Sequence, residues 1–187
     1  MPNHCENHLT VEGKPYDVRK FARDHYRVPD DWDGNLGEQK STLDFSFSVP
    51  YPENFLDRQR LKQSSHSGWY DYHNQHWGTK WNAYDIHPDN FPEVIANCED
   101  GRLTYSFSTA WSPPVEWLST ASRKYPDLTF TLGYVEYGCD FAGKTVYEDG
   151  IPVEEDYFQP HDLLGTDDPS DDEWDALHQE VLEKISA

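Results

Sequence analysis

Two tryptophan-containing segments of the chain carry residues suited to holding a small ligand. They are Trp77-Gly78-Thr79-Lys80-Trp81 and Thr109-Ala110-Trp111-Ser112-Pro113-Pro114. Ligand pockets are mostly apolar with a few placed polar groups, so the indole rings supply walls and the lysine and threonine supply polar contacts. The candidate ligand-pocket residues are Trp77, Lys80, Trp81, Thr109 and Trp111. The alternative is that these aromatic residues anchor a long loop to the core, which is the commoner role of buried aromatic side chains.

A second group with chemical potential lies near the N-terminus. His4, Glu6 and His8 alternate along a predicted strand and therefore share one face of it. Imidazole and carboxylate groups bind zinc or transfer protons. However, alternate positions on one strand are too far apart to hold one ion without help from neighbouring strands. A solvated sheet face is therefore the favoured interpretation, and we predict neither a metal ion nor a cofactor.

Standard catalytic signatures are absent from the sequence. It contains no GxSxG motif, no Walker sequence and no GxGxxG motif. The three cysteines are widely spaced and form no CxxC pair, which indicates neither a disulfide framework nor a zinc knuckle. A non-enzymatic role in a reducing compartment is the interpretation that fits these observations.

Negative charge is the most distinctive bulk property of the chain. The 187 residues include 35 Asp and Glu against 15 Lys and Arg, for a formal net charge of -20. Such a surface repels nucleic acid and anionic membranes and attracts basic proteins. From Glu148 onward, Lys184 is the single Lys or Arg. The residues that we predict to bind a partner are Asp167, Asp168, Asp171, Asp172, Glu173 and Asp175. A merely solubilising acidic surface is the alternative.

Hydrophobic periodicity predicts the elements that must position these groups. Apolar and polar residues alternate in four stretches, as expected for strands with one buried face: Cys5–Val11, Leu43–Val49, Leu103–Thr109 and Leu128–Tyr134. Helical spacing follows the first and third of these stretches, with Pro15 at the start of one helix and Ser112 as the expected N-cap of the other. Short helices are also expected near Phe55–Leu61 and Trp69–His76.

This order of elements predicts an α+β fold. Two helices on one face of a four-stranded antiparallel sheet, in the order βαββαβ, make a ferredoxin-like sandwich. We expect the domain to cover residues 1–147, with an insertion at about residues 50–100 between the second and third strands. After Gly138, Phe141–Tyr147 is expected to add a hairpin strand.

Residues 148–187 are expected to form an acidic linker and an amphipathic C-terminal helix. Ser170-Asp171-Asp172-Glu173 has the pattern of a capping box. The apolar stripe of the predicted helix contains Trp174, Leu177, Val181, Leu182 and Ile185. This stripe would dock on the domain or on a second copy of the chain, which makes a homodimer through the helix an open possibility.

Several short segments of the chain resemble the YubB-type ferredoxin-like domain family. They are the Met1-Pro2-Asn3 opening, the two tryptophan segments, and Tyr134-Val135-Glu136-Tyr137-Gly138. The resemblance covers roughly residues 1–147 and implies a ferredoxin-like domain of a kind carried by phages, plasmids and other mobile elements. It implies no established activity. No apolar run approaches membrane-spanning length, so we expect a cytoplasmic protein of a bacterial host.

Three functional hypotheses follow. The leading one is a non-enzymatic acidic protein of a mobile genetic element that binds a basic or nucleic-acid-binding host protein, as a DNA-mimicking inhibitor of host defence does. Direct contact with nucleic acid or a membrane is not expected. The alternative is a small-ligand-binding protein or enzyme that uses the tryptophan pocket. The third is a structural or assembly protein of a virion.

Overall fold

Strand β1 (His4–Glu12) occupies the centre of the fold. It pairs antiparallel with β3 (Arg102–Ala110) on one side and with β4 (Thr129–Glu136) on the other. The structure is a computed structural model that describes residues 3–29, 40–53, 55, 67–164 and 170–186. Because side chains alternate along β1, Leu9 and Val11 lie in the main core, while Glu6, His8 and Thr10 face the other side.

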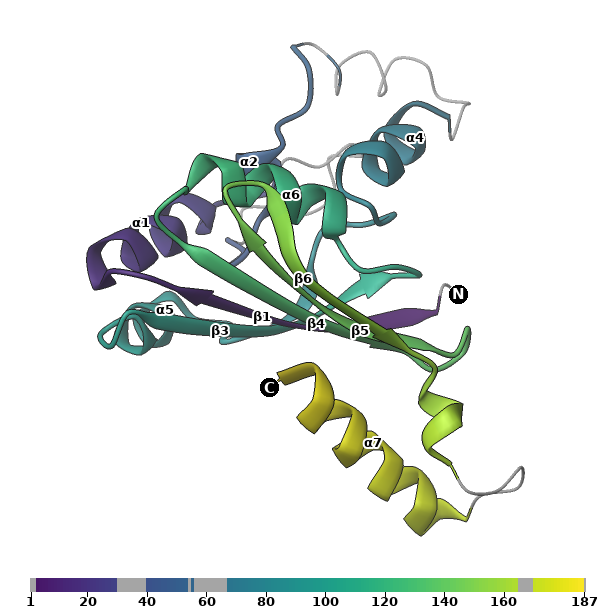
Figure 1. Ribbon diagram of the computed structural model, residues 1–187. Coiled ribbons are helices and arrows are strands. Elements are labelled where there is room, and N and C mark those ends of the chain that lie inside the picture. Colours follow the sequence, from purple (N-terminus) through teal and green to yellow (C-terminus); the bar gives the residue numbers. More distant parts are fainter. Residues whose placement is uncertain (1–2, 30–39, 54, 56–66, 165–169, 187) are drawn as a thin grey trace.

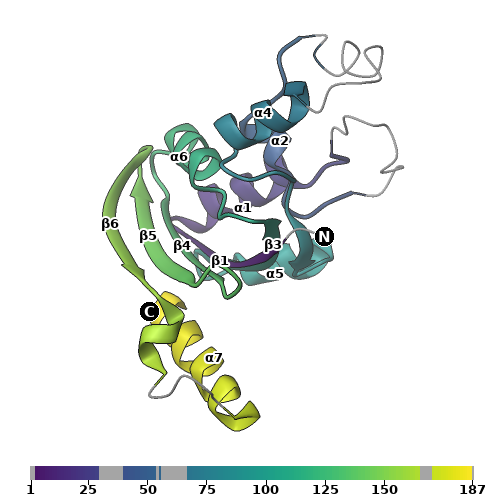
Figure 2. The same cartoon turned by 90° about the vertical axis from the view of Figure 1, so that its right-hand side faces the viewer.

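The sheet extends outward from β1 to six strands in the described part of the chain. The order is β2-β3-β1-β4-β5-β6, and every neighbouring pair is antiparallel. The three outer strands are β2 (Tyr84–His87), β5 (Phe141–Glu148) and β6 (Ile151–Phe158). Figure 2 shows β6 as the outermost strand, curving together with β5 away from β1.

Helices cover the two faces of the sheet unequally (Figure 1). Helices α1 (Pro15–His25) and α6 (Val115–Lys124) pack on the face that carries Leu9 and Val11, and they share the main core with it. The opposite face is contacted by α7 (Asp171–Ser186) over β4 and β5. The other helical elements in the described part of the chain are α2 (Phe45–Ser48), α4 (Ser67–His76), α5 (Phe91–Asn97) and the 3₁₀ turn η1 (Pro160–Leu163). None of the described helices is long and apolar enough to cross a membrane.

Most elements predicted from the periodicity are confirmed. The first, third and fourth predicted strands correspond to β1, β3 and β4, and the hairpin strand corresponds to β5. Helix α1 begins at Pro15 as expected, and α4 includes the predicted helix Trp69–His76. The helix expected near Phe55–Leu61 lies almost entirely outside the described residues. Helix α6 begins later than expected, because Ser112 does not cap it: its hydroxyl donates to the carbonyl oxygen of Gly78 at 2.6 Å.

The second predicted strand, Leu43–Val49, is wrong. Its centre forms helix α2, whose N-cap is Asp44. The Asp44 carboxylate accepts hydrogen bonds from the backbone N–H of Ser46 at 3.1 Å and from the Ser46 hydroxyl at 2.6 Å. A carboxylate that satisfies free N–H groups at the start of a helix favours a helical turn over an extended chain. The alternation of Phe45 and Phe47 with serines therefore does not mark a strand here.

Strand β2 takes the place beside β3 that the wrong strand was expected to fill. As a consequence, the interval expected as an insertion between the second and third strands, at about residues 50–100, is also placed incorrectly. It contains α4, β2 and α5, so the additional segment lies between α1 and β2 instead.

The acidic linker expected after residue 147 is replaced by structure over part of its length. Ile151–Phe158 forms β6, which pairs with β5 along nearly its whole length. The C-terminal helix is confirmed as α7. The domain boundary at residue 147 stays a prediction, although β6 belongs to the same sheet as the strands before that boundary.

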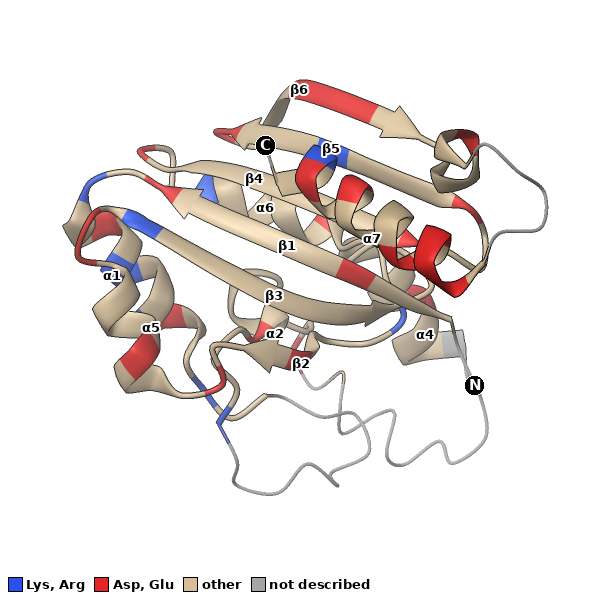
Figure 3. Ribbon diagram, turned by 90° about the horizontal axis from the view of Figure 1, so that it is seen from below, with Lys and Arg blue, Asp and Glu red and all other residues tan. Residues whose placement is uncertain are grey.

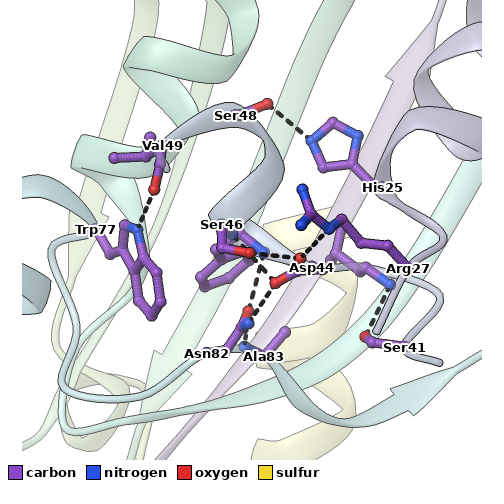
Figure 4. A network of polar contacts seen from close by, with 12 residues as sticks. His25, Arg27, Ser41, Asp44, Ser46, Ser48, Val49, Trp77, Asn82 and Ala83 are labelled. Atoms are coloured by element: carbon purple, nitrogen blue, oxygen red, sulfur yellow. Dashed lines mark hydrogen bonds and ion pairs between the residues drawn. The ribbon is translucent and has the colours of Figure 1, made fainter. Parts of the chain in front are cut away.

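A buried polar network holds the segment around α2 against the sheet (Figure 4). Asp44 has no exposed side-chain surface, and its Oδ2 lies 3.2 Å from Nε of Arg27. The side-chain amide of Asn82 donates to Asp44 Oδ1 at 2.6 Å, and its oxygen accepts from the N–H of Phe45 at 3.0 Å. Burial raises the pKa of Asp44, and the hydrogen bonds from Ser46 and Asn82 and the charge of Arg27 oppose that rise.

Two buried histidines predict how the stability of this fold depends on pH. His25 donates from Nδ1 to the Phe21 carbonyl, and Ser48 donates to its Nε2, each at 2.8 Å. Burial lowers the pKa of His25 and of His73 from 6.5 to about 4. The unfolded chain therefore binds protons that the folded chain does not, so the free energy of unfolding falls as the pH falls from 6.5 towards 4.

Urea unfolding at about pH 7 and about pH 5 measures this dependence. The variant His25→Gln is expected to lose less stability between the two pH values than the unmodified protein does. Comparing the two proteins removes the contribution of the carboxylates, which titrate in both. Equal losses in the two proteins would contradict the assignment of a buried neutral histidine.

Candidate functional site

Helix α7 lies on the sheet through an apolar stripe. Leu177, Val181 and Ile185 are buried and form a second core with Val135 of β4 and Ala142 of β5. The helix comes close to the sheet at Gly133, because a Cβ atom at that position would lie 2.2 Å from the backbone oxygen of Ile185. The apolar stripe predicted from the sequence therefore contacts the chain's own sheet. A homodimer through this helix stays a prediction.

Helix α7 begins with a run of acidic residues. Asp171, Asp172, Glu173 and Asp175 are all exposed. Half of the predicted capping box is present: the backbone N–H and the hydroxyl of Ser170 both donate to Glu173 Oε2 at 2.8 Å, while the Glu173 N–H donates to the Ser170 carbonyl and not to its hydroxyl. The hydrogen bonds from Ser170 lower the pKa of Glu173, so this carboxylate has a structural role besides its charge. Asp167 and Asp168 lie outside the described residues.

Strand β6 supplies acidic residues that the sequence analysis did not select. Glu154, Glu155 and Asp156 follow one another along the strand, and all are exposed. Because consecutive residues of a strand point to opposite faces, the run presents charge on both sides of β6. Lys144 on β5 lies 3.3 Å from Glu154 and partly balances it. The sequence signal for a strand was the apolar residues that flank the acidic run.

Acidic residues are concentrated on β6 and α7, as the red segments of these two elements in Figure 3 show. Three carboxylates lie on β6 and six on α7, against Lys184 as the single Lys or Arg of these two elements. The Lys184 ammonium lies 5.2 Å from the centre of the Phe158 ring. We call the charged residues of β6 and α7 the acidic face. Its carboxylates are held on a strand and a helix, so the arrangement can present fixed negative charge to a partner.

The tryptophan residues fall into two groups with different exposure. Trp77 is only 1% exposed and stacks on His73, and its Nε1 donates to the Val49 carbonyl at 3.2 Å. The loop that contains it is joined to the second tryptophan segment, since Thr79 donates to the Ala110 carbonyl at 3.0 Å. Trp77 is therefore an anchor of the core and does not line an open surface.

Trp81 and Trp111 instead flank a lysine near the surface. The Lys80 ammonium lies 5.0 Å from the centre of the Trp81 ring and 4.8 Å from that of Trp111. Trp111 is 43% exposed and has a φ of 74°, which is unusual for a bulky residue. Thr109 is buried, and its hydroxyl bonds to the Ser112 carbonyl at 2.8 Å. Of the five predicted pocket residues, the structure therefore brings three together: Lys80 and the two indole rings beside its ammonium.

On the sheet face opposite α1 and α6, polar residues of β1 pair with residues of other strands. His8 Nδ1 lies 3.1 Å from the Ser106 hydroxyl, and His4 Nδ1 lies 2.7 Å from the Tyr84 hydroxyl. Within the described ranges, no group of three or more His, Cys, Asp or Glu side chains is placed to hold a metal ion. A cavity of about 270 Å³ lies elsewhere, beside β2, with Ser41 and Asn82 among its lining residues.

The fold and the comparisons agree on the class of protein, an α+β protein of the ferredoxin-like kind. The chain belongs to the family described as the ferredoxin-like domain in Api92-like protein, whose model matches residues 76–175. The crystal structure of protein Api92 from Yersinia pseudotuberculosis is similar, with a TM-score of 0.52 and 11% sequence identity. That similarity covers 84% of this chain and 98% of that one.

At such low identity the structural likeness supports the fold alone. No curated protein matches the chain. The ferredoxin-like part of the predicted resemblance is confirmed. The YubB-type assignment and the association with mobile elements stay predictions.

The close approach of α7 to Gly133 can be tested by substitution. In Gly133→Ala the new methyl group would meet the Ile185 backbone, which cannot move aside as a side chain can. We expect α7 to leave the sheet at least in part, so amide hydrogen exchange along Asp171–Ser186 should accelerate. Gly143→Ala is the matched control, because its methyl group would meet the Tyr134 hydroxyl and the backbone oxygen of Asp156 in β6, and not α7. Unchanged exchange of α7 in Gly133→Ala would show that the helix is not held in this position.

Proposed function

We propose that the protein is a non-enzymatic binding protein whose acidic face engages a basic surface of another protein. The observation that carries the proposal is the position of the carboxylates of this face on β6 and α7. β6 is a strand of the sheet, and α7 packs on that same sheet. Because the backbone that carries these carboxylates is already ordered in a strand and a helix, a partner has less conformational freedom to remove than with an unstructured acidic segment. They also attract a basic partner over a distance of about 8–10 Å at moderate salt.

We further propose that the partner is a nucleic-acid-binding protein, and that the acidic face takes the position of a phosphate backbone, as in a DNA-mimicking inhibitor. Phosphate-binding grooves are lined by Lys and Arg, which would meet carboxylates equally well. The resemblance to YubB-type domains supports a setting in a phage, plasmid or other mobile element, with a host defence protein as the target. It equally supports a βαββαβ core made of β1, α1, β2, β3, α6 and β4.

Capture of proteins from a bacterial lysate tests the proposal. The first variant removes four charges of the acidic face, with the substitutions Glu155→Gln, Asp156→Asn, Asp171→Asn and Asp172→Asn. The control variant removes the same four charges from exposed positions elsewhere, with Glu99→Gln, Asp71→Asn, Asp100→Asn and Asp127→Asn. Both variants have the same net charge, so the comparison separates the face from the overall charge.

We expect the unmodified protein and the control to retain a basic partner that the first variant binds on the order of tenfold more weakly, because each exposed ion pair contributes roughly 0.5 kcal/mol. Binding should also weaken as the ionic strength rises from about 0.05 to about 0.2 M. Equal weakening in both variants would show that the overall charge acts, and the absence of any basic partner would refute the proposed function.

The surroundings of Lys80 favour a second candidate function, the binding of a small ligand. Trp81 and Trp111 flank the Lys80 ammonium, and Trp111 is partly exposed in a left-handed backbone conformation. Strained conformations of this kind occur often at binding sites. We propose that a ligand at this position would stack on Trp111.

Thermal unfolding in the presence of nucleotides and metal ions measures such binding. A saturable increase in Tm that is lost in Trp111→Ala, while Trp174→Ala retains it, would favour this second function. Trp174 is a suitable control because it is similarly exposed, at 36%, and lies on α7. The lack of any shift with the unmodified protein would count against a ligand at Trp111.

A further inference from the structure

Strand β6 forms an open edge of the sheet. It pairs with β5 on one side, and no strand in the described part of the chain pairs with its other side. All residues from Ile151 to Tyr157 are exposed. An edge strand presents a row of N–H and C=O groups without strand partners, so it is a template on which another extended chain can pair.

The opposite edge of the sheet offers no comparable template. Strand β2 is four residues long, and its register with β3 is irregular between Tyr84 and His87. Short and irregular strands are common ways in which proteins prevent unwanted pairing. β6 is eight residues long. Pro152 lacks a backbone N–H and the register with β5 shifts between Val146 and Tyr147, but from Glu154 to Phe158 β6 continues the sheet regularly. Of the two edges, β6 is therefore the one that can accept a further strand.

Apolar side chains on β6 add surface that a partner can bury. Ile151 is 62% exposed, Val153 is 55% exposed and Tyr157 is 65% exposed. A strand that served only to resist pairing would gain nothing from three large exposed apolar residues. Partly exposed tyrosine and aliphatic residues beside polar ones are instead typical of surfaces that bind other proteins.

The acidic run on β6 determines which partner fits. Antiparallel pairing of two copies through β6 would bring Glu154, Glu155 and Asp156 of one copy close to the same residues of the other. Like charges opposite each other destabilise a strand pair, so a second copy of the chain is disfavoured. An extended segment rich in Lys or Arg would instead place opposite charges across the new pair, and its aliphatic residues would contact Val153 and Tyr157.

We propose that β6 is a docking strand, which takes an extended basic segment of a partner protein as an additional strand of the sheet. This inference rests on the proposed function, since it specifies how part of the acidic face would engage a basic protein. Main-chain hydrogen bonds would give the complex its geometry, and the charges and apolar contacts of β6 would select the sequence, as in other cases of strand addition.

The probe for this inference is the acetylated, amidated peptide Lys-Val-Lys-Val-Lys-Val-Lys. A second peptide of the same sequence carries a methyl group on the backbone nitrogen of each valine and of each inner lysine. The two peptides have the same charge, but the methylated one cannot pair as a strand on either edge. Both are titrated into the full-length, ¹⁵N-labelled protein, and the amide shifts and the Kd are measured by NMR.

We expect the unmodified peptide to shift the amides of β6 and β5 and to bind at least tenfold more tightly than the methylated peptide. Equal binding of the two peptides, or shifts confined to the acidic turn of α7, would overturn strand addition. The acidic face would then remain a charged surface, and the lysate experiment would decide the proposed function independently. Absence of binding by both peptides would also overturn strand addition without bearing on that experiment.

A pair of matched variants tests the apolar contacts. The double variant Val153→Ser, Tyr157→Ser is expected to weaken the binding of the unmodified peptide roughly tenfold, because two large apolar contacts are lost. The control Val28→Ser with Tyr16→Ser makes the same chemical changes at exposed positions away from β6 and should leave the Kd unchanged. Equal effects of both variants would overturn the assignment to β6. The formation of a dimer through β6 as the protein concentration rises, seen as a doubling of the molecular mass, would also overturn the assignment, because a second copy would then occupy the strand.

Discussion

The buried carboxylate of Asp44 holds the segment after α1 in a helical turn although the side chains of that segment alternate as in a strand. Its oxygens accept hydrogen bonds from Ser46 and Asn82 and lie beside Arg27, so three separate parts of the chain meet at one side chain. A buried carboxylate without such partners would strongly destabilise the fold, and each contact therefore depends on the others. Because the segment is helical and does not join the sheet as a strand, the position beside β3 is left to the short strand β2.

The sheet is extended mainly on its other side. One edge ends at β2, whereas beyond β4 the chain adds β5 and β6 in succession. The longer sheet also has a wider second face, and α7 covers it over β4 and β5. The carboxylates of the acidic face lie on the two elements added last, β6 and α7. Their backbone is fixed by the sheet and by the second core, although their side chains are exposed.

The core of the fold could be predicted from the sequence because its signal is repeated along each element. β1, β3 and β4 each show several alternating apolar residues, and α1 begins at Pro15 as its pattern indicates. Leu43–Val49 shows the same alternation, but Asp44 is bonded to Asn82, which is distant in the sequence, and no local pattern reveals that contact. β6 was missed because an exposed edge strand has no buried face to produce alternation. Trp77 and Trp111 have similar neighbours in the sequence, and only the structure separates a core residue from a partly exposed one.

The central position of β1 also affects how the chain can fold as it is synthesised. β1 is complete by residue 12, yet its partners β3 and β4 begin only at residues 102 and 129. Asn7 and Thr109, which are hydrogen-bonded in the finished sheet, are separated by 102 residues. Contacts between distant residues form slowly, and unpaired strands of an incomplete sheet are prone to aggregate. During synthesis β1 therefore remains without its sheet partners until about ninety further residues have followed it, and an unpaired strand is exposed to aggregation for that time.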